Sequence, residues 1–165
     1  MMAVMSRRVL IGSAVAMGAG AGFLGLRALA APQQRFPLTL SDAEWRKRLS
    51  PAQYAVLRQA HTERAFTSPL DKEKRAGTFV CAGCALPLFS SKTKFDSGTG
   101  WPSFWAPLPD AVGTGRDFDL GVLRIEVHCR RCGGHLGHVF DDGPRPTGKR
   151  YCMNGTAMKF VASKI

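Results

Sequence analysis

The spacing of apolar residues predicts two short helices ahead of a longer region of strands. Residues 41–44, Ser-Asp-Ala-Glu, form a capping-box sequence that predicts a helix through about Leu49. Residues 50–53, Ser-Pro-Ala-Gln, repeat the signal with proline at the first helical position, and apolar residues follow at helical spacing. The second helix is expected to end before Thr67. Two small helices therefore precede the rest of the domain.

From residue 78 onward, short apolar runs separated by glycine-containing turns replace the helical spacing. Residues 90–109 are rich in Ser, Gly, Pro and aromatic residues and are interpreted as a long loop. Residues 118–127 alternate in two phases, which one strand with a one-residue bulge near Gly121 reconciles. The other predicted strands are 78–81, 136–140, 151–154 and 156–161. The pattern predicts a mainly β fold, a small antiparallel β domain with short helices at its start.

The first thirty residues have the layout of an export signal. They contain no acidic residue and place Arg7 and Arg8 before a weakly apolar stretch, 9–26. The surroundings of the arginine pair resemble a twin-arginine motif, and residues 28–30, Ala-Leu-Ala, form a small-x-small cleavage pattern. We expect cleavage after Ala30 and a periplasmic protein. The alternative is an uncleaved inner-membrane anchor, because the apolar stretch is almost long enough to span a bilayer.

These signals divide the chain into an export signal at 1–30, a linker at 31–37 and one folded domain at 38–165. The chain of 165 residues is 45% hydrophobic, which suits a single core. Three of its 23 Lys and Arg residues lie in the first thirty residues, so the remainder carries 20 basic and 12 acidic groups, a net charge of +8. The charges are interspersed and the protein is expected to be exported, so we expect no nucleic-acid partner. We also expect a monomer.

Four of the five cysteines form two Cys-x-x-Cys pairs, Cys81 with Cys84 and Cys129 with Cys132. Two such pairs supply the four thiolates of a tetrahedral structural zinc site, and we expect one Zn²⁺. Export of an already folded protein would let the metal load in the reducing cytoplasm. The alternatives are two disulfides or two redox-active pairs. Two independent redox motifs in one small domain are uncommon, so we favour zinc.

The fifth cysteine, Cys152, is the candidate nucleophile. Strand alternation would place Arg150 and Asn154 on the same face as Cys152. A guanidinium and an amide beside a thiol are expected to stabilise the thiolate and lower the pKa of the thiol. The alternative is an inert core cysteine.

Two of the four histidines lie close together, at His135 and His138. A regular strand would send these two side chains to opposite faces, so a bend around Gly137 is needed for them to converge. An imidazole beside a thiolate can donate a proton or orient a polar group near neutral pH. The alternatives are a histidine hydrogen-bonded to backbone or a metal ligand.

A glycine-rich loop at residues 98–105 carries three aromatic side chains. Trp101 and Trp105 are expected to form an apolar wall open to solvent, whereas Phe104 is interpreted as a core residue. Composition alone does not identify what binds there.

Together these motifs resemble the B-type peptide methionine sulfoxide reductases (the MsrB/SelR family), which act on the R epimer. The resemblance extends over residues 38–161, essentially the whole domain. The matching segments are 81–84 (CAGC), 92–98 (KTKFDSG), 100–104 (GWPSF), 129–133 (CRRCG), 134–144 (GHLGHVFDDGP) and 150–154 (RYCMN). So many ordered matches do not arise by chance.

The resemblance implies a domain of two antiparallel sheets and an activity, reduction of methionine (R)-sulfoxide in oxidised proteins or peptides of the cell envelope. A thiol attacks the sulfoxide sulfur, a histidine protonates the oxygen, and a sulfenic acid remains for a reductant to clear. The resemblance implies these roles: catalysis by Cys152, His135 and His138; substrate binding by Trp101, Asn154 and Arg150; and zinc binding by Cys81, Cys84, Cys129 and Cys132.

The chain departs from the family pattern at two places. Many members have a resolving cysteine where this chain has Thr99. With four cysteines on zinc, no thiol remains to form an internal disulfide with Cys152. An external thiol reductant, thioredoxin-like or other, is therefore predicted to attack the sulfenic acid directly. The second departure, Gly155-Thr156 in place of Ser-Ala, is expected to have little consequence.

Two rival functions use the same motifs. One is a non-catalytic zinc module that binds a polyanion, and the other is a thiol-disulfide oxidoreductase that uses the Cys-x-x-Cys pairs. Stoichiometric bound zinc would exclude the second rival, and loss of sulfoxide reduction on substituting Cys152 would exclude the first.

Overall fold

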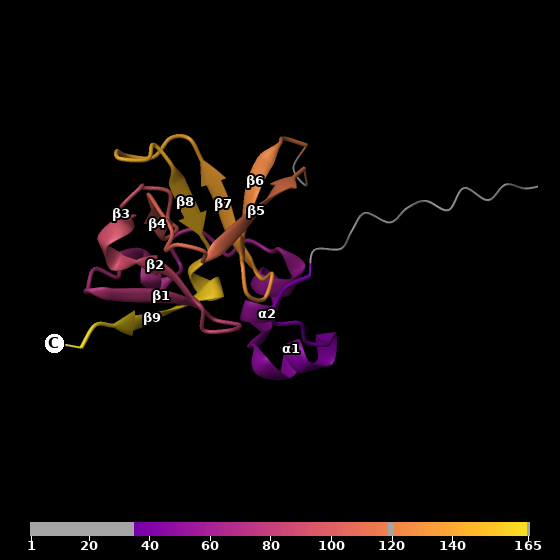
Figure 1. The fold of residues 1–165 in the computed structure, drawn as a ribbon. Coiled ribbons are helices and arrows are strands. Elements are labelled where there is room, and N and C mark those ends of the chain that lie inside the picture. The colour runs from indigo at the N-terminus through magenta and orange to yellow at the C-terminus, as the bar shows by residue number, and fades with distance from the viewer. Residues whose placement is uncertain (1–34, 119–120, 165) are drawn as a thin grey trace, which may run out of the picture. The chain divides into compact units, whose positions relative to one another are not determined.

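The computed structural model describes residues 35–118 and 121–164 and begins with the two predicted helices (Figure 1). Helix α1 covers Asp42–Arg48 and helix α2 covers Pro51–Gln59. Helix α2 ends before Thr67, as predicted, and its C-cap residue Ala60 takes a left-handed φ of 54°. Residues 60–68 follow as an irregular stretch, here called the connecting segment, before the first strand.

Both predicted capping boxes are formed. The side chains of Ser41 and Ser50 each accept a hydrogen bond from the backbone N–H three residues later. The side chains of Glu44 and Gln53 accept the serine N–H groups in return. Local sequence alone therefore decides where these helices begin.

The described residues contain two antiparallel sheets, which confirms the mainly β fold (Figure 1). The small sheet has the strand order β2-β1-β9, and the large sheet has the order β3-β4-β8-β7-β6-β5. The strands are β1 Gly77–Cys81, β2 Pro87–Ser90, β3 Lys94–Phe95, β4 Ser103–Phe104, β5 Val112–Asp117, β6 Arg124–Cys129, β7 His135–Phe140, β8 Arg150–Met153 and β9 Met158–Ala162. Three short 3₁₀ helices complete the elements: η1 Pro69–Lys72, η2 Ser91–Thr93 and η3 Gly155–Ala157.

The prediction of one bulged strand over residues 118–127 is wrong. The structure has a hairpin, in which β5 and β6 are joined by a turn where Gly121 takes a φ of 70°. Residues 119–120 of this turn lie outside the described residues. A register shift does occur, but it lies within β6, between Val127 and His128, where β6 pairs with β7. Exposed apolar side chains at the hairpin tip produced the alternation that suggested a strand.

The segment predicted as a loop, residues 90–109, contains the two-residue strands β3 and β4. Strands this short cannot display an alternation, so the hydrophobic pattern does not reveal them. They matter for the site, because β4 pairs with β8 and places Ser103 opposite Cys152.

Aromatic side chains join the two sheets. Phe79 of β1, Phe89 of β2 and Phe104 of β4 are fully buried. The Phe104 ring centroid lies 4.9 Å from that of Phe79 and 4.4 Å from that of Phe89. Full burial of one such side chain contributes about 1.5–3 kcal/mol. The cluster fixes the large sheet, and with it β8, relative to the small one.

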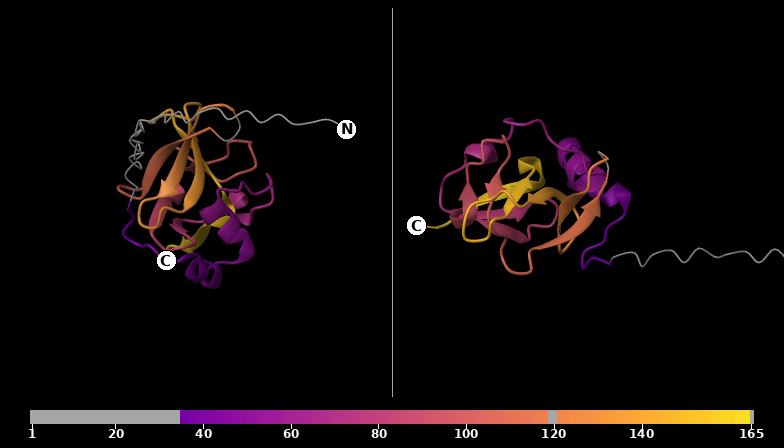
Figure 2. Two further views of the ribbon diagram at one scale, coloured as in Figure 1. Left: turned by 90° about the vertical axis from the view of Figure 1, so that its right-hand side faces the viewer. Right: turned by 90° about the horizontal axis from the view of Figure 1, so that it is seen from above.

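The start of β9 lines a pocket together with the start of α2, and the strand then runs away from the two helices (Figure 2). Within the described residues, no helix is both long and apolar enough to cross a membrane. The expected export signal at 1–30 lies outside the described residues. Of the expected linker, residues 35–37 are described, and the Phe36 ring packs edge-on against His128 with centroids 5.5 Å apart.

Candidate active site and metal centre

The two Cys-x-x-Cys pairs meet at one buried point. Cys81 ends β1 of the small sheet and Cys129 ends β6 of the large sheet, so the cluster joins distant parts of the chain. The sulfurs of Cys81, Cys84, Cys129 and Cys132 all lie within 4.8 Å of one another, and all four residues are buried. The four cysteines therefore form a single cluster that can hold a metal ion.

The sulfur–sulfur distances fit metal-bound thiolates and exclude disulfides. The Sγ atoms of Cys81 and Cys132 are 3.8 Å apart, and those of Cys84 and Cys129 are 3.5 Å apart. A disulfide needs about 2.05 Å. Four thiolates at about 2.3 Å from one tetrahedral ion lie about 3.8 Å from each other. Both of these contacts join one motif to the other, so the sulfurs form one cluster rather than two separate redox-active Cys-x-x-Cys pairs.

Cys152 lies outside this cluster, half-buried in β8, and its thiol is free. The strand register places it opposite His138 of β7 on one side and Ser103 of β4 on the other. Its Sγ lies 3.8 Å from the Oγ1 of Thr99. The structure therefore supplies the uncommitted thiol that the sequence predicts.

The prediction of a lowered pKa for this thiol is wrong. Burial raises the pKa of Cys152, and this effect outweighs the hydrogen bond from Thr99, the charge of Arg150 and the hydrogen bond from Ser103. The guanidinium acts in the predicted direction, but the sequence does not reveal how far the neighbouring strands cover the sulfur. The resting group at neutral pH is therefore mainly the neutral thiol.

The Asn154 amide is engaged elsewhere and does not serve the thiol. Its Nδ2 donates to the carbonyl oxygen of Leu136 at 3.1 Å, and its Oδ1 accepts the N–H of Glu63 at 2.9 Å. Asn154 is buried and follows directly after β8. Backbone groups hold both ends of the amide, so its orientation is fixed before any ligand arrives.

The two histidines converge, as the predicted bend requires. The ring centroids of His135 and His138 are 5.4 Å apart, and Gly137 between them takes a φ of 153°. A Cβ at Gly137 would lie 2.2 Å from the carbonyl oxygen of Cys152. Only glycine lets β7 approach β8 this closely here.

A carboxylate holds each imidazole. The Nδ1 of His135 is 2.8 Å from Oε1 of Glu126, and the Nε2 of His138 is 2.6 Å from Oδ2 of Asp117. Hydrogen bonds from His128 and His135 lower the pKa of Glu126 to about 2. Burial lowers the pKa of His138, and the hydrogen bond to Asp117 partly opposes that effect. Glu126 thus stays charged at neutral pH, and the two carboxylates orient rings that are held away from water.

A cavity of about 160 Å³ opens beside the Cys152 thiol. It is lined by Thr62, Trp101, Arg124, Gly137, His138, Phe140, Cys152 and Asn154. Four of the sequence-predicted site residues thus share one cavity: Trp101, His138, Cys152 and Asn154.

The other two predicted residues lie just outside that lining. His135 lines a neighbouring pocket together with Glu126. Arg150 acts on the thiol from the same strand, while its Nε and one terminal nitrogen donate to the Asp142 carboxylate, both at 2.8 Å. The roles of His135 in catalysis and of Arg150 in substrate binding remain predictions.

The aromatic wall differs in one member from the prediction. Trp101 lines the cavity and Phe104 is fully buried in the core, as predicted. Trp105 is not part of the cavity lining, and the second aromatic side chain there is Phe140. Phe140 ends β7, and a strand residue after two histidines carries no local sign of a binding role.

Sequence reasoning also missed the contribution of the connecting segment. Thr62 lines the cavity, and Glu63 contacts both Trp101 and Asn154. Because this segment has neither helical nor strand periodicity, nothing local marks it. The same holds for Asp117 and Arg124, whose side chains meet at 2.5 Å across the β5–β6 hairpin.

Comparison with known proteins matches residues 49–162 to the SelR domain. The protein named "Peptide methionine sulfoxide reductase MsrB" from Leptospira interrogans is 53% identical over 126 residues, which span 76% of this chain and 96% of that protein. A protein of the same name from Bradyrhizobium diazoefficiens is 56% identical over 120 residues, 72% of this chain and 86% of that protein. "Peptide methionine sulfoxide reductase B1, chloroplastic" from Arabidopsis thaliana is 54% identical over 125 residues, 75% of this chain and 62% of that protein.

Proposed function

The chain belongs to the SelR domain family, and from this premise we propose that it reduces methionine (R)-sulfoxide in peptides and proteins to methionine. The observation that carries the proposal is the direct pairing of Cys152 with His138 on adjacent strands, at a cavity that Trp101 also lines. A nucleophile, a proton donor and an apolar surface thus converge on a space that suits a small side chain.

Trp101 and Phe140 supply apolar surface on this cavity, where the methyl end of the substrate would pack. The sulfoxide sulfur would then face the Cys152 thiol and its oxygen would face His138. Only one arrangement of methyl group, oxygen and lone pair satisfies all three contacts. Selection of a single sulfoxide epimer follows from this geometry.

The proposed chemical step transfers one oxygen atom. The Cys152 sulfur attacks the sulfoxide sulfur as the thiol gives up its proton, and His138 protonates the oxygen so that its bond to the substrate sulfur can break. This attack forms an S–S bond between Cys152 and the substrate, and the protonated oxygen is released as hydroxide. The hydroxide then attacks the Cys152 sulfur, the S–S bond breaks, methionine leaves with the electron pair, and Cys152 becomes a sulfenic acid. The substrate gains two electrons and the thiol loses two, and the thiol proton ends on the sulfenic oxygen or is returned to His138.

The raised pKa of Cys152 suits such a cycle. A thiol that stays neutral at rest is slow to react with stray oxidants, since the thiolate is the reactive form. Proton transfer toward the bound sulfoxide oxygen would generate the thiolate only when substrate is present.

An external thiol would then restore the enzyme. Position 99 carries a hydroxyl 3.8 Å from the Cys152 sulfur, and the other four cysteines are held in the buried cluster. A first thiol attacks the sulfenic acid, releases water and forms a mixed disulfide with Cys152. A second thiol releases Cys152 and leaves as a disulfide with the first. The reductant would be a thioredoxin-like protein or another thiol.

We infer that the four-cysteine cluster holds one structural Zn²⁺. Cys81, Cys84, Cys129 and Cys132 would be its ligands, and the ion would tie the end of β1 to the end of β6. Four thiolate ligands leave no open position for a substrate.

We also propose a monomer exported to the periplasm by the twin-arginine signal at 1–30, where it would repair oxidised envelope proteins without binding nucleic acid.

The experiment that tests the proposed function is Cys152→Ser. We expect reduction of methionine (R)-sulfoxide in a peptide, with dithiothreitol as reductant, to fall by at least about a thousandfold. The S epimer should not react with the wild type. Bound metal and melting temperature should stay at wild-type values, because Cys152 lies outside the cluster. A variant that retains activity would refute the nucleophile, and equal rates for both epimers would refute the assigned specificity.

A further inference from the structure

Glu63 lies in the connecting segment and contacts two residues that line the cavity, without lining it itself. Its backbone N–H donates to the Oδ1 of Asn154 at 2.9 Å, and its carbonyl oxygen accepts the indole N–H of Trp101 at 3.1 Å. The two peptide groups that flank the Glu63 Cα atom therefore bridge Asn154 and Trp101, which are both proposed to bind substrate.

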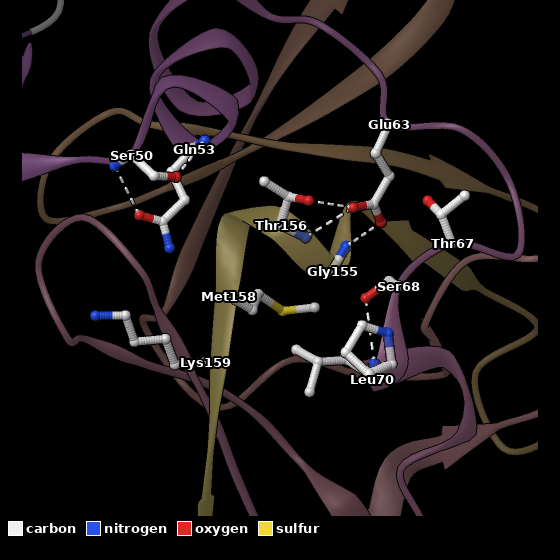
Figure 3. A pocket seen from close by; sticks show the side chains of 11 residues that line it. Ser50, Gln53, Glu63, Thr67, Ser68, Leu70, Gly155, Thr156, Met158 and Lys159 are labelled. Carbon is white, nitrogen blue, oxygen red and sulfur yellow. Dashed lines mark hydrogen bonds between the residues drawn. The ribbon is translucent and has the colours of Figure 1, made fainter.

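The Glu63 carboxylate anchors this bridge to η3, the turn that follows β8. Its Oε1 accepts the N–H of Gly155 at 2.5 Å. Its Oε2 accepts the N–H of Thr156 at 2.9 Å and the hydroxyl of Thr156 at 2.5 Å. Figure 3 shows the carboxylate pointing at these two residues, and all three residues line the same pocket. The Asn154 side chain does not cap η3, so Glu63 satisfies the turn instead.

The three donors explain how the carboxylate can be held here. Among the described residues, no Lys or Arg side chain forms an ion pair with Glu63, and three hydrogen-bond donors hold its carboxylate instead. Hydrogen bonds to an ionised acceptor are about twice as strong as neutral ones. These three hydrogen bonds therefore make a strong link between the connecting segment and η3.

The residues at positions 155 and 156 suit this carboxylate. A Cβ at Gly155 would lie 1.9 Å from the Oγ of Ser68, so the close packing of the connecting segment on η3 needs glycine. Thr156 then supplies the hydroxyl that reaches Glu63. The Gly155-Thr156 pair is expected from the sequence to have little consequence. In the structure both residues bind the Glu63 carboxylate directly.

We propose that Glu63 is a positioning residue for the reductase site. It holds Trp101 and Asn154 at a set separation in the cavity that Cys152 also lines. The proposal rests on the proposed function, because positioning has meaning only relative to a bound sulfoxide. Glu63 touches neither the thiol nor the cavity, so its loss should weaken substrate binding while the nucleophile stays intact.

The test compares Glu63→Ala and Glu63→Gln with Glu44→Ala. Glu44 is a matched control, because its carboxylate also accepts a backbone N–H and a serine hydroxyl, but at the start of α1. KM and kcat are measured with a peptide containing methionine (R)-sulfoxide, together with the rate of Cys152 alkylation by iodoacetamide. The indole N–H resonance of Trp101, assigned with Trp101→Phe, reports the hydrogen bond to Glu63 directly.

We expect Glu63→Ala to raise KM about tenfold, with kcat and the alkylation rate within about twofold of wild type. Glu63→Gln keeps one acceptor oxygen and should show an intermediate KM. The Trp101 indole resonance should shift in Glu63→Ala, while the resonances of Trp45 and Trp105 stay in place. Glu44→Ala should lower the melting temperature and leave KM unchanged.

Three results would overturn the proposal. They are an unchanged KM and indole resonance in Glu63→Ala, an equal rise of KM in Glu44→Ala, and a loss of activity that follows the melting temperature alone. If Glu63→Ala does not fold, Glu63→Gln with wild-type KM would overturn it as well. A wild-type protein that fails to reduce the sulfoxide would instead refute the proposed function, which separates the two failures.

Discussion

In the four-cysteine cluster every sulfur is buried among three other sulfurs, whereas Cys152 is half-buried and has a hydroxyl, a guanidinium and an imidazole around it. The cluster lies where strands of the two sheets end. Cys152 lies within the large sheet, between β4 and β7. The same side chain thus meets two environments in one small domain.

The difference shows that neighbours, rather than the residue type, decide what a thiol does. Four closely spaced thiolates repel one another unless a cation binds them. Once bound, the four thiolates are unreactive and cross-link the two parts of the chain that carry them. A single thiol covered by strands keeps its proton until a bound group can accept it. Reactivity at Cys152 therefore depends on the cavity, whereas stability depends on the cluster.

The largest effect should come from emptying the cluster. Structural zinc sites contribute on the order of 10 kcal/mol to folding. We therefore expect removal of the metal by a chelator, or Cys84→Ser, to abolish cooperative thermal unfolding or lower the melting temperature by more than about 10 °C. Calorimetry and elemental analysis measure both properties. Cys152→Ser is the control and should keep full metal content. An apo protein as stable as the holo protein would contradict a structural role.

His138→Gln should affect catalysis at the Cys152 site and leave the four-cysteine cluster unchanged. Loss of a general acid costs about 10²–10⁴-fold in rate, and we expect a fall in kcat of that size with metal content unchanged. His135→Gln is the matched comparison and should cost less, because His135 lines the neighbouring pocket. Steady-state kinetics of both variants would decide the assignment. Equal losses, or a larger loss for His135→Gln, would show that the proton comes from the other ring.

Thr99→Cys should turn the single-thiol site into a paired one. The Thr99 hydroxyl lies 3.8 Å from the Cys152 sulfur, so a sulfur at position 99 can reach it with a small side-chain movement. After one equivalent of sulfoxide, mass spectrometry should find loss of two hydrogens in this variant and gain of one oxygen in the wild type. Ser97→Cys is the control, since Ser97 contacts Thr99 rather than Cys152. An internal disulfide at Cys152 in the wild type would contradict the proposed cycle.

Arg150→Gln should give the smallest effect. The Arg150 charge lowers the pKa of Cys152 against the larger effect of burial, so its loss should raise that pKa further. Less thiolate is then present at pH 8, and alkylation by iodoacetamide should slow by about three- to tenfold, with its pH profile moved to higher pH. Arg130→Gln, which changes an exposed arginine paired with Asp110, is the control. A profile that moves to lower pH would have the wrong sign.

Much of this site was predictable from local sequence. Capping boxes place the starts of α1 and α2, and paired Cys-x-x-Cys spacing identifies four thiols of one kind. The motif around Cys152 singles out the fifth cysteine. Each of these features depends on residues only a few positions apart in the chain. They can therefore be predicted from the sequence.

The remainder depends on contacts between distant segments. The sequence favoured a low pKa for Cys152, because Arg150 is visible two positions away and the covering strands are not. It also gave no reason to single out Glu63, whose partners lie 38 to 93 positions along the chain.

The order of residues by itself determined which side chains could carry the chemistry, namely five thiols, two neighbouring histidines and a tryptophan in a glycine-rich loop. Tertiary structure alone decided which of them share a cavity, how deeply the reactive sulfur is covered, and which carboxylates hold the rings and the turn. The physical reason is that side-chain identity is a local property. Burial and electrostatic surroundings, in contrast, are sums over everything that the fold brings near.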